Sequence, residues 1–541
     1  MNPYIGKTYG EALALIGERF GPREALVFQG RRWNFCEVRR EIDRTAARLA
    51  TLGLAPGDKV AIWLPNRPEF LWYWLAAARM GLVAVVLNTR LTRDEFVYQL
   101  AQSDSRAVVV AARDTFRDFL GDLAAVTPAI RTGAAGGLAC HDLPKLDHVI
   151  CVDPPGPEYL GVTDWSGPVL PDLPVPPPAI DPAAPALIAY SSGTTALPKG
   201  VMLNHCVFRK VYDGGERMGT REDDRLYLCV PLFGVLATFN GILNFWVRGA
   251  AIVLAERFEI RQCLDDLVGE RCTALHMLPA MVDAILQHPD FPRTDLSRLR
   301  IGIALTQDAD LIDIIANRLG VKGIVTSYGL TETTGVATRT WWNEPLETRK
   351  ASQGTPLPGV EAKIVDPETG ATLPPNAPGE IWLRGYCIMP GYYNKPEETK
   401  AALTADGWLR TGDLGRMDEK GAVSFISRLR DSYKHKGFNV STVEVEKAIG
   451  RHPAVVAAQV VGLPDRRFGE VGAAFVILRQ SLDSAALIDF LRPSLASFKL
   501  PSYVFPIDRF PVTAGTEKVQ KFRLREIGID RIRQTGRGEN Q

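Results

Sequence analysis

The sequence predicts an α/β protein: a large N-terminal domain of two doubly wound sheets and a small β-barrel, followed by a small α+β C-terminal domain. Two observations lead to this prediction. Helical patterns alternate with short apolar runs through most of the chain, which is typical of parallel strands covered by helices on both faces. After residue 350 the pattern changes to short strands separated by glycine and proline turns.

The first sheet is predicted between residue 9 and about residue 150. A helical pattern over residues 37–52 precedes apolar runs at residues 60–63 and 107–110, so helix and buried strand alternate in this part of the chain. The residues that follow, 153–185, are dense in proline, and we expect them to form a surface connection.

The most apolar window of the chain covers residues 70–87. Arg79 and Gly81 interrupt it, so we expect a buried helix that leads into a strand, and no membrane span. The N-terminal residues lack the basic stretch, apolar stretch and small-residue cleavage site of an export signal. We therefore expect a cytoplasmic protein.

The pattern of apolar runs also predicts the elements after residue 200. A second alternating series predicts the strands of the second sheet at residues 226–230, 251–254, 274–277 and 324–326. The predicted β-barrel part extends from about residue 350 to 428 and includes strands at residues 362–365 and 380–383. The C-terminal module mixes helices and strands, which are expected at residues 443–451, 455–461, 473–478 and 484–491.

Composition excludes several classes of protein. Of the 541 residues, 46% are apolar and 23% are charged, and the formal net charge is +1. These values describe an ordinary globular enzyme and exclude a disordered chain or one that coats nucleic acid. The eight cysteines are scattered without a C-x-x-C pair, so the sequence predicts a reducing compartment and neither a disulfide framework nor a zinc site.

The segment with the most chemical information is residues 190–201, which follows the apolar run 186–189. Lys199 is followed by glycine and not by Ser or Thr, which excludes the common nucleotide loop of NTPases. A polar surface turn is the alternative, but the order and density of the residues favour a phosphate-binding loop. Gly193 lets backbone amides approach an anion, Lys199 adds a positive charge, and the hydroxyl donors are Ser191, Ser192, Thr194 and Thr195.

This loop resembles the signature of the acyl-adenylate-forming superfamily, although Ala196 stands where that family usually has glycine. Residues 326–335 match a second segment of the same superfamily. The resemblance implies that Tyr328 stacks on adenine and that Thr331 contacts the α-phosphate. It also implies that Glu332 holds Mg²⁺, a hard cation for which a carboxylate is a suitable ligand.

Two further segments extend the resemblance. Asp413 lies in a matching Thr-Gly-Asp segment, which implies that its carboxylate accepts hydrogen bonds from the ribose hydroxyls. Arg428 matches the arginine that contacts the nucleotide. Arg430 occupies the hinge position, where Asp or Lys is usual, and Gly437 lies in the segment that the small domain would present for the second half-reaction.

Residues 510–521 resemble the last motif of the superfamily, in which one lysine bridges the substrate carboxylate and the α-phosphate. We assign this catalytic role to Lys518. Its neighbour Glu517 replaces a customary glycine, and the nearby Lys521 is expected to be a solvated surface residue.

Phe233, Gly234 and Ala304 are predicted to line the acyl pocket, again by analogy with the superfamily. Gly234 stands where relatives often have histidine, so it leaves volume in apolar surroundings. Relatives that activate amino acids place an aspartate in this segment, but no acid lies between Pro231 and Arg248. We therefore expect a hydrophobic acid as substrate and not an amino acid.

The resemblance thus predicts a two-domain ligase with domains at residues 1–428 and 429–541. It would use ATP, Mg²⁺ and coenzyme A to convert a hydrophobic, fatty or related, acid through an acyl-adenylate into an acyl-CoA thioester. One alternative is transfer to a carrier protein or an amine, and another is a non-catalytic nucleotide-binding descendant. The expected partners are small molecules and not nucleic acid, and assembly as a homodimer stays open.

Overall fold

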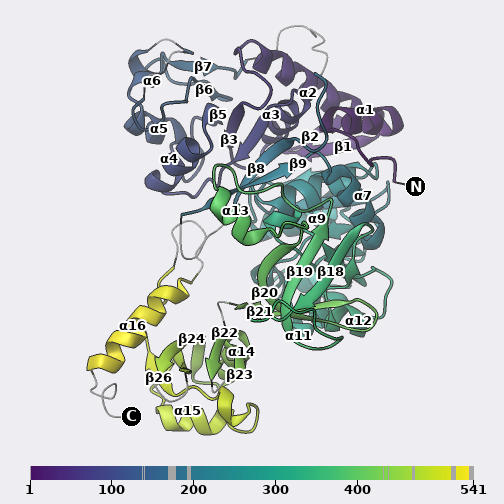
Figure 1. Cartoon of the computed structure of the whole chain (residues 1–541). Coiled ribbons are helices and arrows are strands. Elements are labelled where there is room, and N and C mark those ends of the chain that lie inside the picture. The colour runs from purple at the N-terminus through teal and green to yellow at the C-terminus, as the bar shows by residue number, and fades with distance from the viewer. Residues whose placement is uncertain are drawn as a thin grey trace.

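The computed structural model describes residues 2–133, 135, 136, 138, 140–167, 178–191, 197–429, 432–435, 438–465, 469–512 and 519–534. It confirms the predicted α/β class, with a large N-terminal domain and a smaller C-terminal domain (Figure 1). One apolar core is shared by the two seven-stranded sheets of the large domain, whereas the C-terminal domain has apolar clusters of its own.

The first seven-stranded sheet has the strand order β7-β6-β5-β3-β4-β8-β9. Neighbouring strands are parallel except β8 and β9, which form an antiparallel hairpin that puts Ser191 opposite Lys199. The hairpin therefore brings the two ends of the predicted phosphate loop together. The strands are β3 (Lys59–Trp63), β4 (Val83–Val86), β5 (Ser105–Val110), β6 (His148–Cys151), β7 (Val162–Asp164), β8 (Pro185–Ser191) and β9 (Lys199–Asn204).

The apolar window at residues 70–87 forms helix α3 (Pro68–Arg79) and strand β4, as predicted. Pro68 suits the first helical position because its amide would have no partner there, and every side chain from Phe70 to Ala78 is buried. Within the described residues, no helix combines the length and the apolar character that crossing a membrane requires.

The second seven-stranded sheet has the order β14-β13-β12-β10-β11-β1-β2. Its last two strands come from the N-terminal region, which the sequence pattern had assigned to the first sheet. This assignment was wrong because a local apolar run does not encode its partner strand: β1 pairs in parallel with β11, with Leu26 opposite Ile252. The strands are β1 (Glu24–Phe28), β2 (Arg31–Asn34), β10 (Arg225–Leu228), β11 (Ala251–Leu254), β12 (Ala274–Leu275), β13 (Ile301–Ile303) and β14 (Gly323–Val325).

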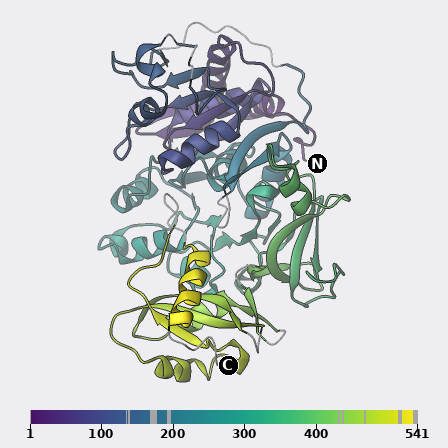
Figure 2. The ribbon, with the colours of Figure 1, turned by 60° about the vertical axis from the view of Figure 1, so that its left-hand side comes forward.

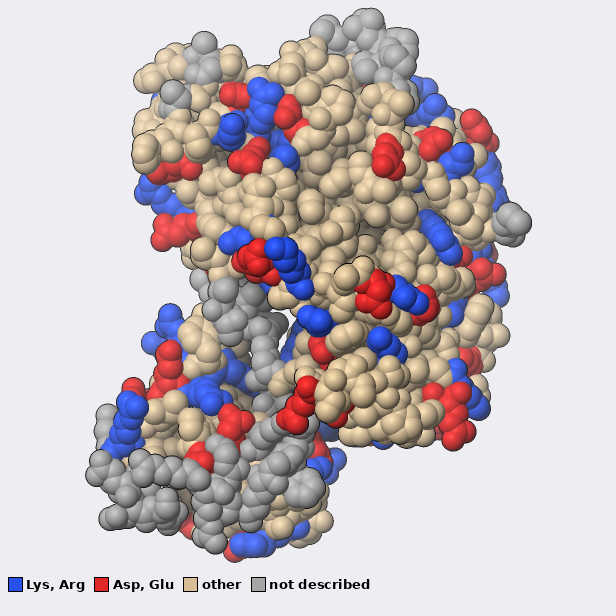
Figure 3. All heavy atoms as spheres, in the orientation of Figure 1, with Lys and Arg blue, Asp and Glu red and all other residues tan. Residues whose placement is uncertain are grey.

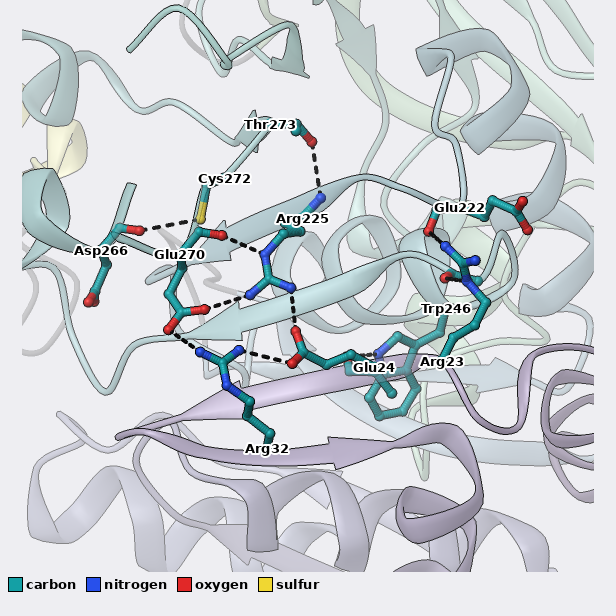
Figure 4. Close-up of polar contacts among 12 residues, drawn as sticks. Arg23, Glu24, Arg32, Glu222, Arg225, Trp246, Asp266, Glu270, Cys272 and Thr273 are labelled. Carbon is teal, nitrogen blue, oxygen red and sulfur yellow. Dashed lines mark hydrogen bonds and ion pairs between the residues drawn. The ribbon is translucent and has the colours of Figure 1, made fainter. Parts of the chain in front are cut away.

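An ion-pair ring formed by Glu24, Arg32, Arg225 and Glu270 joins the edge of this sheet to the turn before β12 (Figure 4). Arg32 contacts Glu24 at 2.9 Å and Glu270 at 2.6 Å, and Arg225 contacts the same two carboxylates. Burial raises the pKa of Glu24, but hydrogen bonds from the two arginines outweigh it and keep the pKa below its usual value. Each charge in the ring is compensated by a neighbour of opposite sign.

The segment predicted as a small β-barrel forms an open sheet instead. Its order is β18-β19-β20-β21, all antiparallel, and in the described residues the outer strands β18 and β21 do not pair. The sheet buries its apolar side against residues 328–337, so it needs no closure. The strands are β18 (Val360–Val365), β19 (Gly379–Gly385), β20 (Leu409–Met417) and β21 (Val423–Arg428), and a separate small sheet contains β15 (Ser327–Tyr328), β16 (Thr338–Arg339) and β17 (Thr355–Pro356).

The C-terminal domain is an α+β unit, as predicted. Helix α16 (Lys521–Gln534) packs along the outside of its sheet, where Leu524 is buried against Leu463 and Phe475 (Figure 2). The sheet has the order β23-β22-β25-β24, with β26 beside β25. The other elements are β22 (Ser432–His435), β23 (Phe438–Ser441), β24 (Val455–Asp465), β25 (Gly469–Leu478), β26 (Tyr503–Pro506), α14 (Thr442–Gly450), α15 (Ser484–Leu491) and the short helix η5 (Ser497–Lys499).

Helices cover the sheets of the large domain. Helix α2 starts earlier than the pattern predicted, because Asn34 and Glu37 form a capping box at its first turn. The helices are α1 (Tyr9–Phe20), α2 (Phe35–Ala50), α4 (Arg93–Gln102), α5 (Phe119–Val126), α6 (Ala129–Thr132), α7 (Val207–Met218), the π-helix η1 (Leu236–Leu243), α8 (Asn244–Trp246), α9 (Ile260–Gly269), α10 (Pro279–Gln287), η2 (Phe291–Arg293), α11 (Ala309–Asn317), η3 (Thr331–Thr333), α12 (Leu346–Ala351) and α13 (Pro396–Ala402).

Basic and acidic side chains are interspersed on the face of the molecule that Figure 3 shows. The described part of this face carries no broad field of one sign, which agrees with the formal net charge of +1.

Candidate active site

A cavity of about 1400 Å³ lies between the large domain and helix α14 of the C-terminal domain. Pockets for one drug-sized ligand typically measure about 300–1000 Å³, so this cavity has room for a nucleotide and a second substrate. The predicted site residues that line it come from segments far apart in the sequence, and they are Ser191, Lys199, Ala304, Thr331, Glu332 and Arg428.

The predicted phosphate loop is anchored at both ends. Ser191 ends β8 and Lys199 begins β9, and the Ser191 hydroxyl lies 3.5 Å from the carbonyl oxygen of Lys199. The Tyr98 hydroxyl donates to the carbonyl of Pro198 at 3.0 Å. Between these ends, Ser192, Gly193, Thr194 and Thr195 lie outside the described residues, so their roles stay predictions.

Tyr392 connects Lys199 with Glu332, and sequence reasoning missed it. Its hydroxyl donates to Glu332 Oε1 at 2.8 Å, and the Lys199 ammonium lies 4.1 Å from the centroid of its ring. Burial, followed by the Glu332 carboxylate, raises the pKa of Tyr392, so the hydroxyl stays protonated and keeps donating. A tyrosine pair after Gly391 was the only sequence signal, and it is too common in turns to identify a site.

The buried residues Tyr328 and Asp413 form a group with Arg428, which is partly exposed and lines the cavity. The Tyr328 hydroxyl donates to Asp413 Oδ2 at 2.7 Å, and Arg428 forms an ion pair with Asp413 Oδ1 at 2.9 Å. Asp413 and Arg428 face each other on β20 and β21, which explains their proximity. Burial, and then the Asp413 charge, raises the pKa of Tyr328 well above its usual value. Both carboxylate oxygens therefore have protein partners in this structure.

The turn after η3 contains a strained residue. Thr334 has φ 58° and ψ 27°, a left-handed conformation that costs a β-branched residue on the order of 1–2 kcal/mol. Its hydroxyl donates to the carbonyl of Cys387 at 2.8 Å, and its amide donates to the carbonyl of Thr331 at 2.9 Å. Such strain persists only where the surroundings hold it, and it is enriched at functional sites.

Part of the cavity lining is apolar. The predicted pocket residue Ala304 lines the cavity, and Phe233 and Gly234 directly precede two other lining residues. A Cβ atom added at Gly234 would meet only the Pro231 carbonyl, at an ordinary contact distance of 3.4 Å, so the glycine does leave space. The apolar lining residues include Val235, Leu236, Ile303, Ala304, Leu305 and Val336.

The small domain meets the cavity through α14, which contributes Val443, Glu446 and Lys447. Lys447 also contacts Asp308 of the large domain at 3.5 Å. The expectation for Lys521 was wrong: its side chain is 21% exposed and bonds to Glu446 and Thr442, both at 2.7 Å. Lys521 begins α16, and the fold of the domain brings that end to α14, which the local sequence does not show.

Three predicted residues of the C-terminal domain, Arg430, Gly437 and Lys518, lie outside the described residues. The residues that flank Lys518 are described: Val512 and Val519 form an antiparallel bridge, and the amide of Gln520 donates to the carbonyl of Pro511 at 2.8 Å. The assigned roles of Arg430, Gly437 and Lys518 stay predictions.

The donor set at Glu332 suits magnesium better than a transition metal. The described residues contain no group of three or more His, Cys, Asp or Glu side chains that could hold an ion. A single carboxylate beside the Thr331 hydroxyl fits Mg²⁺, which proteins commonly bind through one or two carboxylates together with substrate phosphates.

Comparisons with known proteins agree with this geometry. The AMP-binding enzyme model matches residues 14–393, and the AMP-binding enzyme C-terminal domain model matches residues 444–516. The Bacillus subtilis protein YngI, named as an acyl-CoA synthetase, is 33% identical over 98% of both chains. The mitochondrial medium-chain acyl-CoA ligase ACSF2 of Mus musculus is 32% identical over 96% of this chain and 88% of its own.

Solved structures show the same architecture. ATP-bound MatB from Rhodopseudomonas palustris superposes with a TM-score of 0.79 and 27% identity, covering 96% of this chain and 99% of its own. The anthranilate CoA ligase AuaEII, in complex with anthranoyl-AMP, gives a TM-score of 0.80 and 27% identity, with 96% and 97% covered. The chain therefore belongs to the AMP-binding enzyme family and is an adenylate-forming enzyme of the acyl-CoA ligase type.

Proposed function

We propose that this enzyme uses Mg²⁺ and ATP to activate a hydrophobic carboxylic acid and then transfers the acyl group to coenzyme A. The observation that carries the proposal is one cavity whose lining combines the polar residues Lys199, Thr331 and Glu332 with apolar residues such as Ala304 and Val336. A nucleotide bound by the polar residues and an acid bound by the apolar residues would share this one cavity.

In the first half-reaction, a carboxylate oxygen of the acid attacks the α-phosphorus of ATP, and the bond to pyrophosphate breaks. The protein positions the reactants and neutralises charge, and little covalent chemistry is required of it. Lys199 and the hydroxyl loop would bind phosphate oxygens, and Thr331 would donate to the α-phosphate. Glu332 would hold Mg²⁺, which neutralises charge on the leaving pyrophosphate when it is bound.

The nucleoside would lie near the group formed by Tyr328, Asp413 and Arg428. The lining residues Thr411 and Gly412 directly precede Asp413, so a ribose in the cavity would approach this carboxylate from their side. The ion pair between Arg428 and Asp413 orients the carboxylate, as a ribose acceptor requires. Tyr328 would then lie against the adenine.

In the second half-reaction, the thiol of coenzyme A attacks the acyl carbonyl carbon, the bond to AMP breaks, and the thiol proton passes to solvent. We propose that the small domain, residues 429–541, rotates about Arg430 between the two steps, first presenting Lys518 and then the Gly437 segment. Support comes from α14, which lines the cavity in this structure through Val443, Glu446 and Lys447.

The Lys518 assignment has a direct test. Lys518→Ala should slow adenylate formation by about 100-fold or more, because one preorganised charge donor is lost. Thioester formation from a supplied acyl-adenylate should stay close to the wild-type rate. Equal losses in both half-reactions would contradict the division of roles between the two faces of the small domain.

We propose a medium-chain fatty acid or a related apolar acid as the substrate. The apolar lining supports this choice, as do the names of the medium-chain acyl-CoA ligases among the relatives. The test is carboxylate-dependent exchange of labelled pyrophosphate into ATP, with short, medium and long fatty acids, aromatic acids and amino acids. Exchange with amino acids alone, or with none of the acids, would contradict the proposal.

The acceptor is tested separately. The acyl-adenylate formed with the best acid is offered coenzyme A, a carrier-protein thiol or simple amines, and the product is identified by mass spectrometry. Coenzyme A should react at least tenfold faster than the others. Preferential transfer to an amine or a carrier would replace the proposed ligase by the corresponding acyl transferase.

A further inference from the structure

Lys210 is a buried lysine of helix α7 that contacts the turn carrying Thr331 and Glu332. The residue is 1% exposed. Its ammonium donates to the backbone carbonyl of Thr334 at 2.5 Å, and it lies 5.5 Å from the centroid of the Phe239 ring. Lys210 does not line the cavity, so it would reach the reaction only through the residues that it holds.

The charge of Lys210 has no counter-charge nearby. The charged and titratable groups that face it are Arg339 from β16 and the thiol of Cys387, and among the described residues no carboxylate lies within ion-pair distance of it. Burial, and then the charge of Arg339, lowers the pKa of Lys210 to about 7. A buried, uncompensated ammonium is costly, so an apolar side chain would serve stability better at this position.

Arg339 has the same kind of environment. It is fully buried, and its guanidinium donates to Ser327 Oγ at 2.9 Å, Asn240 Oδ1 at 3.1 Å and the Gly214 carbonyl at 2.9 Å. Ser327 and Asn240 line the cavity. Two buried cations thus lie one layer behind the cavity wall, and both donate to neutral acceptors there.

The contact with Thr334 is placed where the turn needs support. Thr334 is a β-branched residue in the left-handed backbone conformation, and its carbonyl accepts the hydrogen bond from Lys210. The next residue, Gly335, also has a positive φ of 91° and lines the cavity. Without the ammonium, a threonine would relax toward negative φ and carry the preceding Thr331 and Glu332 with it.

We propose that Lys210 is a positioning residue for adenylate formation: through the Thr334 carbonyl it holds the turn that presents Thr331 and Glu332 to the cavity. This inference rests on the proposed function, because it concerns the same phosphate and metal site. It assigns no contact between Lys210 and a substrate.

The first test substitutes Lys210→Met, which removes the donor and keeps most of the volume. Pyrophosphate exchange should lose about 10- to 100-fold in kcat, the range known for residues that orient a metal ligand. The KM for the acid should change less than kcat, because Lys210 itself does not line the cavity. Arg349→Met is the matched control: Arg349 is a buried arginine that donates to the carbonyls of Lys322, Ile324 and Glu344, away from this turn.

Thermal unfolding separates positioning from simple destabilisation. Both variants are compared at a temperature where circular dichroism shows them folded, and only Lys210→Met should lose exchange activity. Equal activity losses in the two variants, or no loss in Lys210→Met, would overturn the inference.

A second-site substitution makes the test sharper. Asparagine adopts the left-handed region more readily than threonine. If Lys210 acts by holding that conformation, Thr334→Asn should restore exchange by about threefold or more in the Lys210→Met background and give no gain in the wild type. Absence of any recovery, with the double variant folded, would count against the conformational explanation.

Failure of the proposed function can be distinguished from failure of the inference about Lys210. If the wild type exchanges pyrophosphate with none of the acids, the proposed function fails regardless of Lys210. Binding of Mg²⁺·ATP, measured by calorimetry, then still tests the inference, because Lys210→Met should weaken it about tenfold while Arg349→Met should not. Unchanged Mg²⁺·ATP binding in Lys210→Met would overturn the inference in that case.

Discussion

Two regions of the large domain differ in whether their cationic side chains are paired with carboxylates. In the ion-pair ring, Arg225 lies between the carboxylates of Glu24 and Glu270, and every charge has an opposite neighbour (Figure 4). Beside the cavity, Arg339 and Lys210 are more deeply buried, yet they donate only to hydroxyl, amide and carbonyl oxygens.

The difference follows from what each region has to bind. The ring joins β1 and the edge strand β2 to β10, so compensated charges stabilise a contact between distant segments. The proposed ligands of the cavity are anions, namely a triphosphate and a carboxylate. A cation already paired with a carboxylate would have its field cancelled before such a ligand arrived, whereas an uncompensated cation leaves a positive potential in place.

The largest expected effect comes from a matched pair of acid-to-amide substitutions. Glu332→Gln should lower the rate of pyrophosphate exchange by about 100- to 1000-fold, because the metal-binding charge is lost, and change the free energy of unfolding by less than about 1 kcal/mol. Glu270→Gln, in the ring, should do the reverse: it should lower stability and leave exchange unchanged. Similar profiles for both variants would remove the distinction between the two regions.

The second prediction concerns Arg225→Met, which leaves Arg32 as the only cation of the ring. The ring is half-buried, so the loss of stability should fall between that of an exposed and a buried pair, at about 1–3 kcal/mol. Because the pKa of Glu24 is lowered in the folded state, the stabilisation exists above its unfolded pKa and disappears as the pH falls through its folded pKa.

Denaturant unfolding between pH 7 and pH 3 measures this dependence for Arg225→Met. The curves of variant and wild type should converge at acid pH. Arg261→Met is the control, since Arg261 also contacts two acids but is 64% exposed, and it should lower stability less than Arg225→Met does. A constant gap between Arg225→Met and the wild type at all pH values would contradict the ion-pair account.

The residues that carry the chemistry of the site could be predicted from the sequence much better than the residues that hold them in place. Ser191, Lys199, Thr331 and Glu332 lie in contiguous motifs, so their chemistry is visible in the order of residues, and the fold does bring them to one cavity. Tyr392 could not be predicted, because it belongs to a turn with no distinctive pattern and reaches Glu332 only through tertiary structure.

Lys210 and Arg339 were hidden for a different reason. A lysine on a helix is normally solvated, and only the packing of α7 against the motif turn shows that Lys210 is buried. Similarly, the alternating pattern at residues 9–150 predicted one sheet, although β1 and β2 belong to the other, and the short strands after residue 350 predicted a β-barrel that is an open sheet in the structure. Local patterns specify elements, and long-range pairing decides the rest.

The third prediction concerns the pH dependence of Lys210. Because the pKa of this lysine is lowered to about 7, the folded state binds fewer protons than the unfolded state between pH 7 and the ordinary lysine pKa. Stability relative to Lys210→Met should therefore rise with pH, by about 1 kcal/mol from pH 7 to pH 8. A buried arginine cannot titrate in this range, so the Arg349→Met control should show no such slope. A flat difference between the wild type and Lys210→Met would show that Lys210 stays charged in the folded protein.

The smallest expected effect lies at the charge pair between the two domains. This pair differs from both the ion-pair ring and the buried cations beside the cavity, because its two charges are largely solvated. Asp308 and Lys447 are 3.5 Å apart, with side chains 43% and 52% exposed. Such pairs contribute about 0.2–1 kcal/mol. Asp308 also caps α11 by accepting from the amide of Asp310 at 3.0 Å, and asparagine is an equally good cap, so Asp308→Asn removes only the charge.

In the orientation described, the pair holds α14 against the cavity. Asp308→Asn should therefore shift the balance between the two proposed orientations, and change the ratio of the thioester-forming rate from a supplied acyl-adenylate to the adenylate-forming rate by about 1.5- to 5-fold. High salt screens exposed pairs, so it should abolish the difference between variant and wild type. Asp489→Asn is the control, because it removes an exposed pair with Arg492 inside α15 of the same domain. An effect of Asp308→Asn that persists in high salt, or one that Asp489→Asn reproduces, would mean that the interdomain charge pair does not bias the orientation of the small domain.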